Sequence, residues 1–208
     1  MTAAAPMVFV VDDDPSVRKS LTRLIGAAGY AVEAFASARE FLARERYLGP
    51  GCLVLDVRMP GLTGLDLQEA LAGARRRMSI VFVTGHGDIS MSVKAMRSGA
   101  VDFLTKPVDG QVLLDAIERA VTRNVQDRDE EARATEVQER VQMLTPRETE
   151  VFALVVTGML NKQIAFELGI SEKTVKVHRA RVMEKMRTSS VAELVRLADR
   201  VGVIVPKS

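Results

Sequence analysis

The stretch GCLVLDVRMPG, residues 51–61, has the pattern of a buried β-strand that ends on a charge. Residues 52–55 are apolar, Asp56 carries a lone carboxylate, and Pro60 and Gly61 follow shortly after. A continuous apolar run is typical of a strand covered on both faces, as in parallel sheets. A carboxylate at the end of such a strand calls for a partner, because aspartates are almost never buried unpaired.

Four further short runs resemble this strand and alternate with amphipathic stretches of helical length. They are MVFVV (7–11), AVEAF (31–35), SIVFVT (79–84) and VDFLT (101–105). Alternating strands and helices over residues 1–122 indicate an α/β fold: an open, doubly wound parallel sheet of five strands with helices on both faces. We expect the strand order 2-1-3-4-5, in which the first and third strands are neighbours.

Polar side chains stand at the carboxyl ends of these strands, where ligands bind in open α/β sheets. Asp12 and Asp13 follow the first strand, Asp56 the third, Thr84 ends the fourth and Lys106 follows the fifth. Three converging carboxylates repel one another unless a cation joins them, and an all-oxygen set suits Mg²⁺. A carboxylate flanked by Mg²⁺ and a lysine can attack a phosphoryl group. Because five such groups stand in the same position after their strands, a shared site explains them better than five unrelated polar residues.

Length and composition place further limits on the chain. Its 208 residues suffice for two domains, and 47% apolar content supports real cores. The single cysteine, Cys52, cannot form an internal disulfide, which favours a reducing compartment. The N-terminus lacks the basic region of a signal peptide, and no stretch reaches the roughly 18 apolar residues of a membrane span. We expect a soluble, cytoplasmic protein with no membrane association.

The pattern changes after residue 122. Residues 123–144 are charged and contain neither Gly nor Pro, so they form either a helical extension or a polar linker. Residues 145–208 contain four helical stretches and no strand, which predicts a separate, small all-α domain. Its first helix should begin at Thr145, with Pro146 as first helical residue and Glu148 completing a capping box.

The segment NKQIAFELGISEKTVKVHRARVMEKM, residues 161–186, predicts helix, turn, helix. Gly169 should close the first helix and Ser171 should cap the second. On a helical wheel Val175, Val182 and Met186 fall together and should face the core. The remaining face is basic, with six Lys and Arg against two Glu across 172–187, as a helix that enters a major groove requires. A surface helix with solvated charges remains the alternative on this pattern alone.

The motifs VVDDDPSVR, LVLDVRMPGLTGLDL, FVTGHGD and AMRSGAVDFLTKP closely resemble the receiver domain of two-component response regulators, a CheY/flavodoxin-like fold. The resemblance covers residues 7–122 and implies that Asp56 is the phosphoacceptor. It implies a Mg²⁺ site made by Asp12, Asp13, Asp56 and the backbone carbonyl of Arg58. It also implies that Thr84 and Phe103 are switch residues, that Lys106 binds the phosphate and that Lys106–Pro107 is a cis peptide.

Residues 144–186 resemble the LuxR-type helix-turn-helix, so the whole chain is similar to the FixJ-like branch of the NarL/FixJ response regulators. In this sequence the resemblance assigns DNA contacts to Lys162, Thr174, Lys176, Val177, His178 and Arg181. It assigns dimerisation to the last helix, 189–200, through Val191, Leu194, Val195 and Ala198. The domains implied are a receiver (1–122), a helical or charged linker (123–144) and a DNA-binding domain (145–208).

The function implied is that of a transcription factor controlled by a sensor histidine kinase. The kinase would phosphorylate Asp56, and the chain would then form a homodimer, bind specific double-stranded DNA and activate transcription with RNA polymerase as a further partner. No enzymatic activity is expected beyond slow self-dephosphorylation.

Three alternatives stay open at this point. A phosphatase of the haloacid-dehalogenase class also uses a strand-end aspartate, but it needs a second aspartate where Arg58 stands. The receiver could be a mere dimerisation scaffold for a DNA-binding protein, or the chain could be a protein-interaction adaptor.

His86 lies in the loop after the fourth strand. A role in tuning access to the pocket fits this residue better than a role as general acid.

Overall fold

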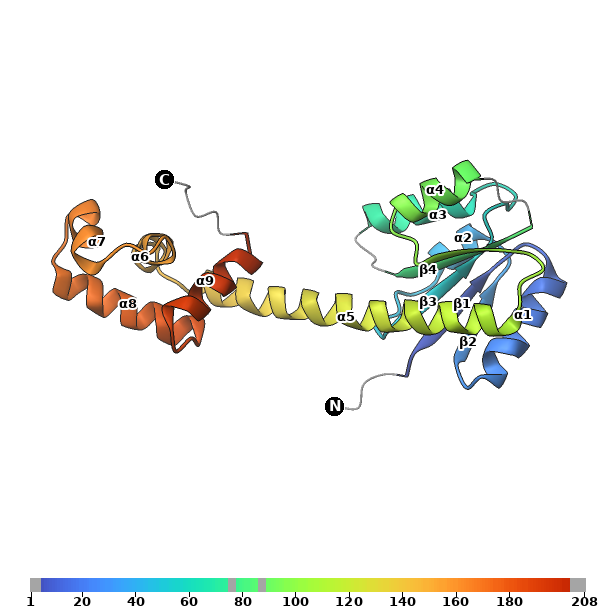
Figure 1. The fold of residues 1–208 in the computed structure, drawn as a ribbon, viewed down its shortest axis with the longest axis horizontal. Helices are drawn as coiled ribbons and strands as arrows, with labels where there is room; N and C mark the ends of the chain where they lie inside the picture. The colour runs from blue at the N-terminus through green and yellow to red at the C-terminus, as the bar shows by residue number, and fades with distance from the viewer. Residues whose placement is uncertain (1–4, 75–77, 86–88, 203–208) are drawn as a thin grey trace. The chain divides into compact units, whose positions relative to one another are not determined.

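The structure of the protein, a computed structural model, describes residues 5–74, 78–85 and 89–202. Its N-terminal part contains one parallel sheet with the strand order β2-β1-β3-β4-β5 (Figure 1), as expected from the sequence. The strands are β1 (Met7–Val11), β2 (Ala31–Phe35), β3 (Gly51–Leu55), β4 (Ser79–Thr84) and β5 (Asp102–Thr105). Strand β3 ends one residue before Asp56, whose amide still donates to the carbonyl of Val11 on β1 at 2.9 Å.

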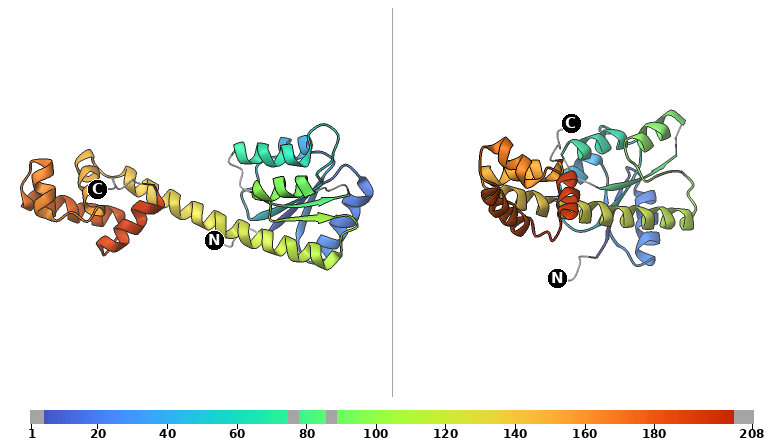
Figure 2. Two further views of the ribbon diagram at one scale, coloured as in Figure 1. Left: turned by 45° about the horizontal axis from the view of Figure 1, so that its top comes forward. Right: turned by 60° about the vertical axis from the view of Figure 1, so that its left-hand side comes forward.

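Helices cover both faces of this sheet (Figures 1 and 2). They are α1 (Pro15–Ala27), α2 (Ala38–Ala43), α3 (Gly64–Gly73), α4 (Ile89–Arg97) and α5 (Gly110–Gln142). One face packs Val8 and Val10 of β1 against α1 and the first part of α5. The opposite face packs Phe9 and Val11 of the same strand against α2, α3 and α4. Both faces of β1 are therefore core, which is why its sequence is continuously apolar rather than alternating.

Helix α5 continues without interruption over 33 residues. Residues 123–142, for which the sequence left helix and polar linker open, are therefore helical. Compact packing divides the chain into two units, residues 1–129 and 130–208, and the boundary falls within α5. Each unit is described separately below.

As far as residue 202, the C-terminal unit contains helices and no strand. After the end of α5 it contains α6 (Pro146–Val156), α7 (Asn161–Leu168), α8 (Glu172–Met186) and α9 (Val191–Arg200). The predicted capping box at Thr145 and Glu148 is confirmed, and Gly169 ends α7 in the left-handed region at φ 64°. Ser171 caps α8 by accepting a hydrogen bond from the amide of Thr174.

The predicted core face of α8 is also confirmed. Val175, Val182 and Met186 have no exposed surface, and they share one apolar cluster with residues of α5, α6, α7 and α9. A helix whose apolar side is fully used in this way leaves its polar side free for a partner.

Among the helices that the structure describes, none combines the length and the apolar character needed to cross a membrane.

Candidate functional site

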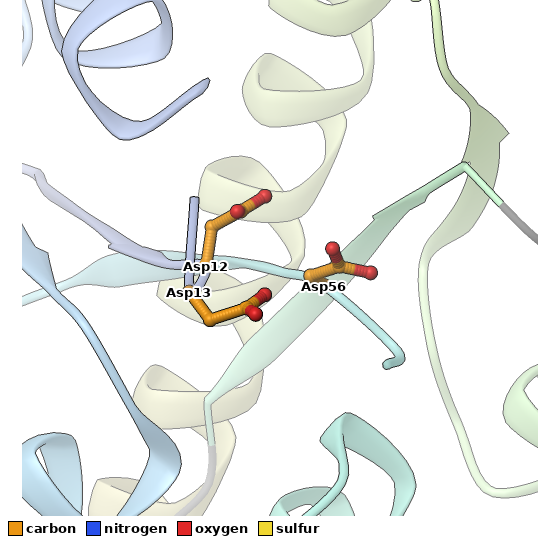
Figure 3. A group of neighbouring side chains, drawn as sticks. All are labelled: Asp12, Asp13 and Asp56. Atoms are coloured by element: carbon orange, nitrogen blue, oxygen red, sulfur yellow. The ribbon is translucent and has the colours of Figure 1, made fainter. Parts of the chain in front are cut away.

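Three carboxylates lie together at the carboxyl edge of the sheet (Figure 3). Asp12 and Asp13 follow β1 and Asp56 follows β3, and the parallel register brings these two strand ends level. One oxygen from each carboxylate lies within 4.8 Å of the others. Asp12 and Asp56 are buried, whereas Asp13 is exposed. The convergence predicted from the strand order is confirmed as geometry.

Lys106 neutralises the two buried members of this cluster. Its Nζ donates to Oδ2 of Asp12 at 2.5 Å and to Oδ2 of Asp56 at 2.8 Å. Burial alone would lower the pKa of Lys106, but the hydrogen bonds to Asp12 and Asp56 and their negative charges outweigh burial and raise the pKa. The ammonium group therefore stays charged and joins the ends of β1, β3 and β5.

The second oxygen of each buried carboxylate is held by the backbone. Oδ1 of Asp12 accepts from the amide of Asp14 at 2.9 Å, and Oδ1 of Asp56 accepts from the amide of Arg58 at 3.2 Å. Arg18 reaches back from α1 and donates to the backbone carbonyl of Asp12 at 2.7 Å. The two carboxylates are thus fixed in orientation before any ligand binds. Groups that are fixed in this way do not have to reorient when charge develops during a reaction.

Asp14, the third acid of the run VDDDP, has another task. Its side chain accepts hydrogen bonds from the hydroxyl and amide of Ser16 and from the amide of Val17, and so caps α1. The side-chain hydrogen bond from Ser16, followed by the two amides, lowers the pKa of Asp14. The cap starts α1 directly behind the pocket.

Gly64 lies directly against the backbone of Asp56. A Cβ at Gly64 would collide with the backbone carbonyl oxygen of Asp56, and the amide of Gly64 donates to the carbonyl of Val57 at 2.9 Å. The first turn of α3 therefore approaches the strand end as only glycine allows. In the sequence, the run PGLTG before α3 indicates a turn at this position.

The remaining residues of the predicted site lie on β4 and β5. Thr84 is buried at the end of β4, and its carbonyl accepts from the amide of Lys106 at 2.8 Å. Phe103 is half-buried on β5 and its ring lies 5.9 Å, between centroids, from that of Phe82. The peptide bond between Lys106 and Pro107 is cis, as the resemblance implied. His86 lies outside the described residues.

The donor set of this pocket fits a small, hard divalent cation. All three carboxylates offer oxygen, and the exposed Asp13 leaves one side of the cluster open to solvent and ligand. Oxygen ligands combined with retained waters are what Mg²⁺ prefers. With the ammonium of Lys106 at one end, the pocket combines carboxylate oxygens that could hold a cation with a fixed positive charge.

The exposed side of α8 carries the residues predicted to meet DNA. Lys176, Val177 and Arg181 are exposed, and Thr174 and His178 are half-buried. Lys162, in the first turn of α7, is exposed as well. Nδ1 of His178 is buried and makes no hydrogen bond within the described part of the chain, so this ring packs against the unit with at most one nitrogen available to a partner.

Comparison with known families agrees with this geometry. Residues 8–118 match the response regulator receiver domain, and residues 142–198 match the bacterial regulatory proteins of the luxR family. The chain is a response regulator of the NarL/FixJ family, on its FixJ-like branch.

Relatives of this regulator match it along nearly all of its length. Nodulation protein W of Bradyrhizobium diazoefficiens is 49% identical over 95% of this chain and 87% of its own. The transcriptional regulatory protein FixJ of Azorhizobium caulinodans is 45% identical over 94% of this chain and 93% of its own. The solved structure of the response regulator StyR, 48% identical, covers 95% of this chain and 100% of its own with a TM-score of 0.81.

The family settles the broad function of the regulator. It is a transcription regulator of a two-component system, with a receiver domain and a LuxR-type DNA-binding domain. Such a receiver implies a histidine kinase as partner, and such a C-terminal domain implies DNA binding. Because its relatives are transcriptional regulators and its receiver domain only accepts phosphoryl groups, the phosphatase alternative no longer applies.

The last helix of the regulator, α9, has less exposed apolar surface than the resemblance implied. Leu194 and Ala198 of α9 have no exposed surface and belong to the core of their own unit. Val191 and Val195 are half-buried against the same core. Of the four residues expected to mediate dimerisation, only these two valines have surface to offer a second chain.

Proposed function

We propose that a sensor histidine kinase transfers a phosphoryl group to Asp56. The observation that carries this proposal is the bridge from Lys106 to both Asp12 and Asp56, beside the third carboxylate of Asp13. Such an arrangement stabilises a carboxylate that carries a phosphoryl group, because the ammonium can follow the added negative charge.

The transfer needs no further protein chemistry at the regulator's side. An oxygen of Asp56 attacks the phosphorus, the bond from phosphorus to its donor breaks, and the donor keeps the bonding electron pair. Asp12, Asp13, Asp56 and the carbonyl of Arg58 would hold Mg²⁺, which when bound neutralises charge on the phosphoryl oxygens. Lys106 then turns from the Asp56 carboxylate to the phosphate attached to it.

The phosphoryl group would reach the rest of the receiver through Thr84 and Phe103. A hydroxyl drawn toward the phosphate vacates space at the end of β4, into which the half-buried Phe103 can turn. An aromatic ring with two alternative packings is the two-state element that such coupling requires.

The surface that changes would be the one made by α4, β5 and α5. Exposed apolar side chains already lie on its helices: Ile89, Val93, Met96 and Val112. A second receiver that covers this face would bury those side chains, so phosphorylation would favour a homodimer. Val191 and Val195 of α9 would add a smaller contact between the DNA-binding domains.

A dimer presents two copies of α8 to DNA half-sites about one helical turn apart. In each copy Lys162, Thr174 and Arg181 would meet phosphates, while Lys176 and Val177 approach base edges. His178 would support this contact from the edge of the helix. We expect a receiver at 1–122, a helical or charged linker at 123–144 and a DNA-binding domain at 145–208.

The output would be activation of transcription, with RNA polymerase as the further partner of the DNA-bound dimer. The phosphoryl donor and the DNA are both found inside the cell, so we place the regulator in the cytoplasm on the ground of its partners.

Acetyl phosphate with Mg²⁺ tests the proposal without knowledge of the kinase. We expect the intact chain to gain the mass of one phosphoryl group, and Asp56→Asn to gain none. Asp14→Asn is the matched control, because Asp14 caps α1 and has no place in the cluster. Absence of labelling in the wild-type protein would instead favour a receiver that serves only as a dimerisation scaffold.

A salt titration separates DNA from a protein partner. Binding to duplex DNA should weaken steeply as salt rises, with a log–log slope that reflects several neutralised phosphates. A flat dependence would favour the adaptor alternative.

A further inference from the structure

The DNA-binding unit extends beyond the residues that match the luxR family. That match begins at residue 142, yet Val137 of α5 is buried at 4% exposure in the same core as Val182 and Met186 of α8. The last turns of α5 are thus built into the packing of this unit. Residues 136–144 are therefore part of the packed structure of this unit and do not serve only as a linker.

Polar contacts connect these turns to the end of α8. Helix α8 ends at Met186, and Arg187 reverses the chain in the left-handed region at φ 52°. The last carbonyls of a helix lack intrahelical partners and carry its negative dipole end. Nη1 of Arg140 donates to the carbonyl of Met186 at 3.0 Å, so α5 supplies both a donor and a positive charge at this end.

Arg140 is itself held in place. Its Nη2 donates to Oε1 of Glu136, one turn earlier on α5, at 2.6 Å, and its side chain is only 17% exposed. A second tether runs the opposite way, since Nζ of Lys185 on α8 donates to the carbonyl of Met143 at 3.1 Å and to Oε2 of Glu148 at 2.6 Å. The end of α8 is therefore joined to the end of α5 and the start of α6 in two directions.

The other helix of the helix-turn-helix ends in the same manner. Nη2 of Arg147 on α6 donates to the carbonyl of Leu168, the last residue of α7, at 2.6 Å. Each of the two helices thus has an arginine from a different helix at its C-terminal carbonyls. Arg147 lies within the residues that match the luxR family, whereas Arg140 lies outside them.

We propose that Arg140 is a positioning residue for DNA recognition, which acts by fixing the C-terminal end of α8 to α5. The proposal rests on the proposed function, in which α8 reads base edges. Contacts to base edges depend on the placement of a side chain within a fraction of an ångström, whereas phosphate contacts tolerate small shifts of a helix. Loosening the end of α8 should therefore reduce discrimination between sequences more than it reduces general attraction to DNA.

The test compares the full-length wild-type chain, Arg140→Gln and Arg133→Gln. Arg133 is exposed on the same helix, so its replacement removes an equal charge without touching α8. The probes are a duplex enriched by the wild-type chain from a random library and a random-sequence duplex of equal length. Binding is measured at a temperature at which circular dichroism reports all three proteins fully folded.

For Arg140→Gln we expect about tenfold weaker binding to the enriched duplex, with affinity for random DNA within about twofold of the wild type. Arg133→Gln should stay within about twofold on both probes. Arg140→Lys, which keeps the charge but has a single donor nitrogen, should fall between them, and it replaces the glutamine variant if that variant does not fold. An Arg140→Gln chain that keeps the wild-type ratio between the two probes would overturn the proposal.

Amide hydrogen exchange reports on the same contact without DNA. The amides of Arg187 and Thr188 donate into the last turn of α8, to Glu184 and Met183, and should exchange about tenfold faster in Arg140→Gln than in Arg133→Gln. Equal exchange in the two variants would contradict the proposal. If the wild-type chain enriches no duplex, the proposed function fails, and exchange still decides whether Arg140 holds the end of α8.

Discussion

At the scale of single residues, Lys106 controls the charge of the pocket. It holds one ammonium between two buried carboxylates, with Nζ distances of 2.5 and 2.8 Å. A divalent cation that joins Asp12, Asp13 and Asp56 must share these carboxylates with the lysine. The ammonium therefore opposes cation binding and favours the phosphoryl group, since the two ligands differ in sign.

Replacing Lys106 by Met should strengthen Mg²⁺ binding and slow the phosphorylation of Asp56. Loss of one positive charge beside the cluster should tighten Mg²⁺ binding about tenfold, or about 1.4 kcal/mol. The same variant should be labelled by acetyl phosphate more slowly, because the charge that stabilises the phosphoryl oxygens is gone. Stabilisation against thermal unfolding by added Mg²⁺ measures the first effect, and weaker Mg²⁺ binding in the variant would contradict the account.

Asp13 tests the metal site with little risk to the fold, because its side chain is exposed. Asp13→Asn should lose most of the Mg²⁺-induced rise in the unfolding temperature. Asp14→Asn should keep both that rise and nearly the wild-type unfolding temperature without Mg²⁺, because asparagine caps a helix about as well as aspartate. A full Mg²⁺ response in Asp13→Asn would remove this residue from the site.

Sequence reasoning located the pocket because its residues are tied to strand ends. Asp12, Asp13 and Asp56 follow apolar runs, and a parallel sheet brings such ends together whatever the helices do. Arg18 and Gly64 escaped notice because their roles come from tertiary approach: a side chain that returns from α1, and a helix turn pressed against a carbonyl. The run PGLTG marks a turn before Gly64 but does not say which group the glycine approaches, and no local pattern marks the contact of Arg18.

At the scale of elements, helix ends account for much of the order in the C-terminal unit. The caps at Thr145 and Ser171 and the glycine end at Gly169 were predicted, because capping is a local property of three or four residues. The continuity of α5 was left open, since a charged stretch has similar local preferences as a helix and as a linker. In the structure the stretch is helical, and its last turns are packed through Val137 into the core of the second unit.

Glu148 joins the start of α6 to the end of α8 and makes the unit sensitive to acid. Its carboxylate accepts from Lys185 at 2.6 Å and from the amide of Thr145 at 2.9 Å, and these hydrogen bonds lower the pKa of Glu148 from 4.5 to about 2. Because the folded pKa lies below the unfolded one, the stabilisation is complete above pH 4.5. It is lost progressively as the pH falls toward 2.

Glu148→Gln should destabilise the C-terminal unit by about 2 kcal/mol at neutral pH. The variant should also lose less stability than the wild type between pH 4.5 and 2. Urea unfolding followed through the methyl signal of the buried Met186 reports on this unit alone. Glu150→Gln, on the exposed side of the same helix, is the control and should change stability by less than about 0.5 kcal/mol. Equal effects of the two changes would refute the role of Glu148.

Arg187 occupies a position that favours glycine. Its φ of 52° is the one positive value among the non-glycine residues that the structure describes, and it follows the last residue of α8. Arg187→Gly should stabilise the unit by about 1 kcal/mol, whereas Arg187→Ala should not, because alanine keeps the strain of a Cβ in this region. The same Met186 signal measures both variants, and a glycine variant that unfolds at lower urea would contradict the assignment of strain.

At the scale of the whole molecule, one covalent change in the first unit must alter what the second unit does. The two functions lie in units with separate cores, and the only backbone between them is the continuous helix α5. Self-association offers a route that requires no change within α8: a receiver dimer raises the effective concentration of the second DNA-binding unit at its half-site. The exposed apolar side chains on α4 and α5 are the surface on which we expect that dimer.

Footprinting of an enriched duplex with the full-length chain tests the central claim most directly. With acetyl phosphate and Mg²⁺ we expect protection of two half-sites about one helical turn apart, at a protein concentration at least tenfold lower than without phosphorylation. Asp56→Asn should show the unphosphorylated pattern under both conditions. Identical protection of the duplex by the phosphorylated and the unphosphorylated wild-type chain would contradict the account.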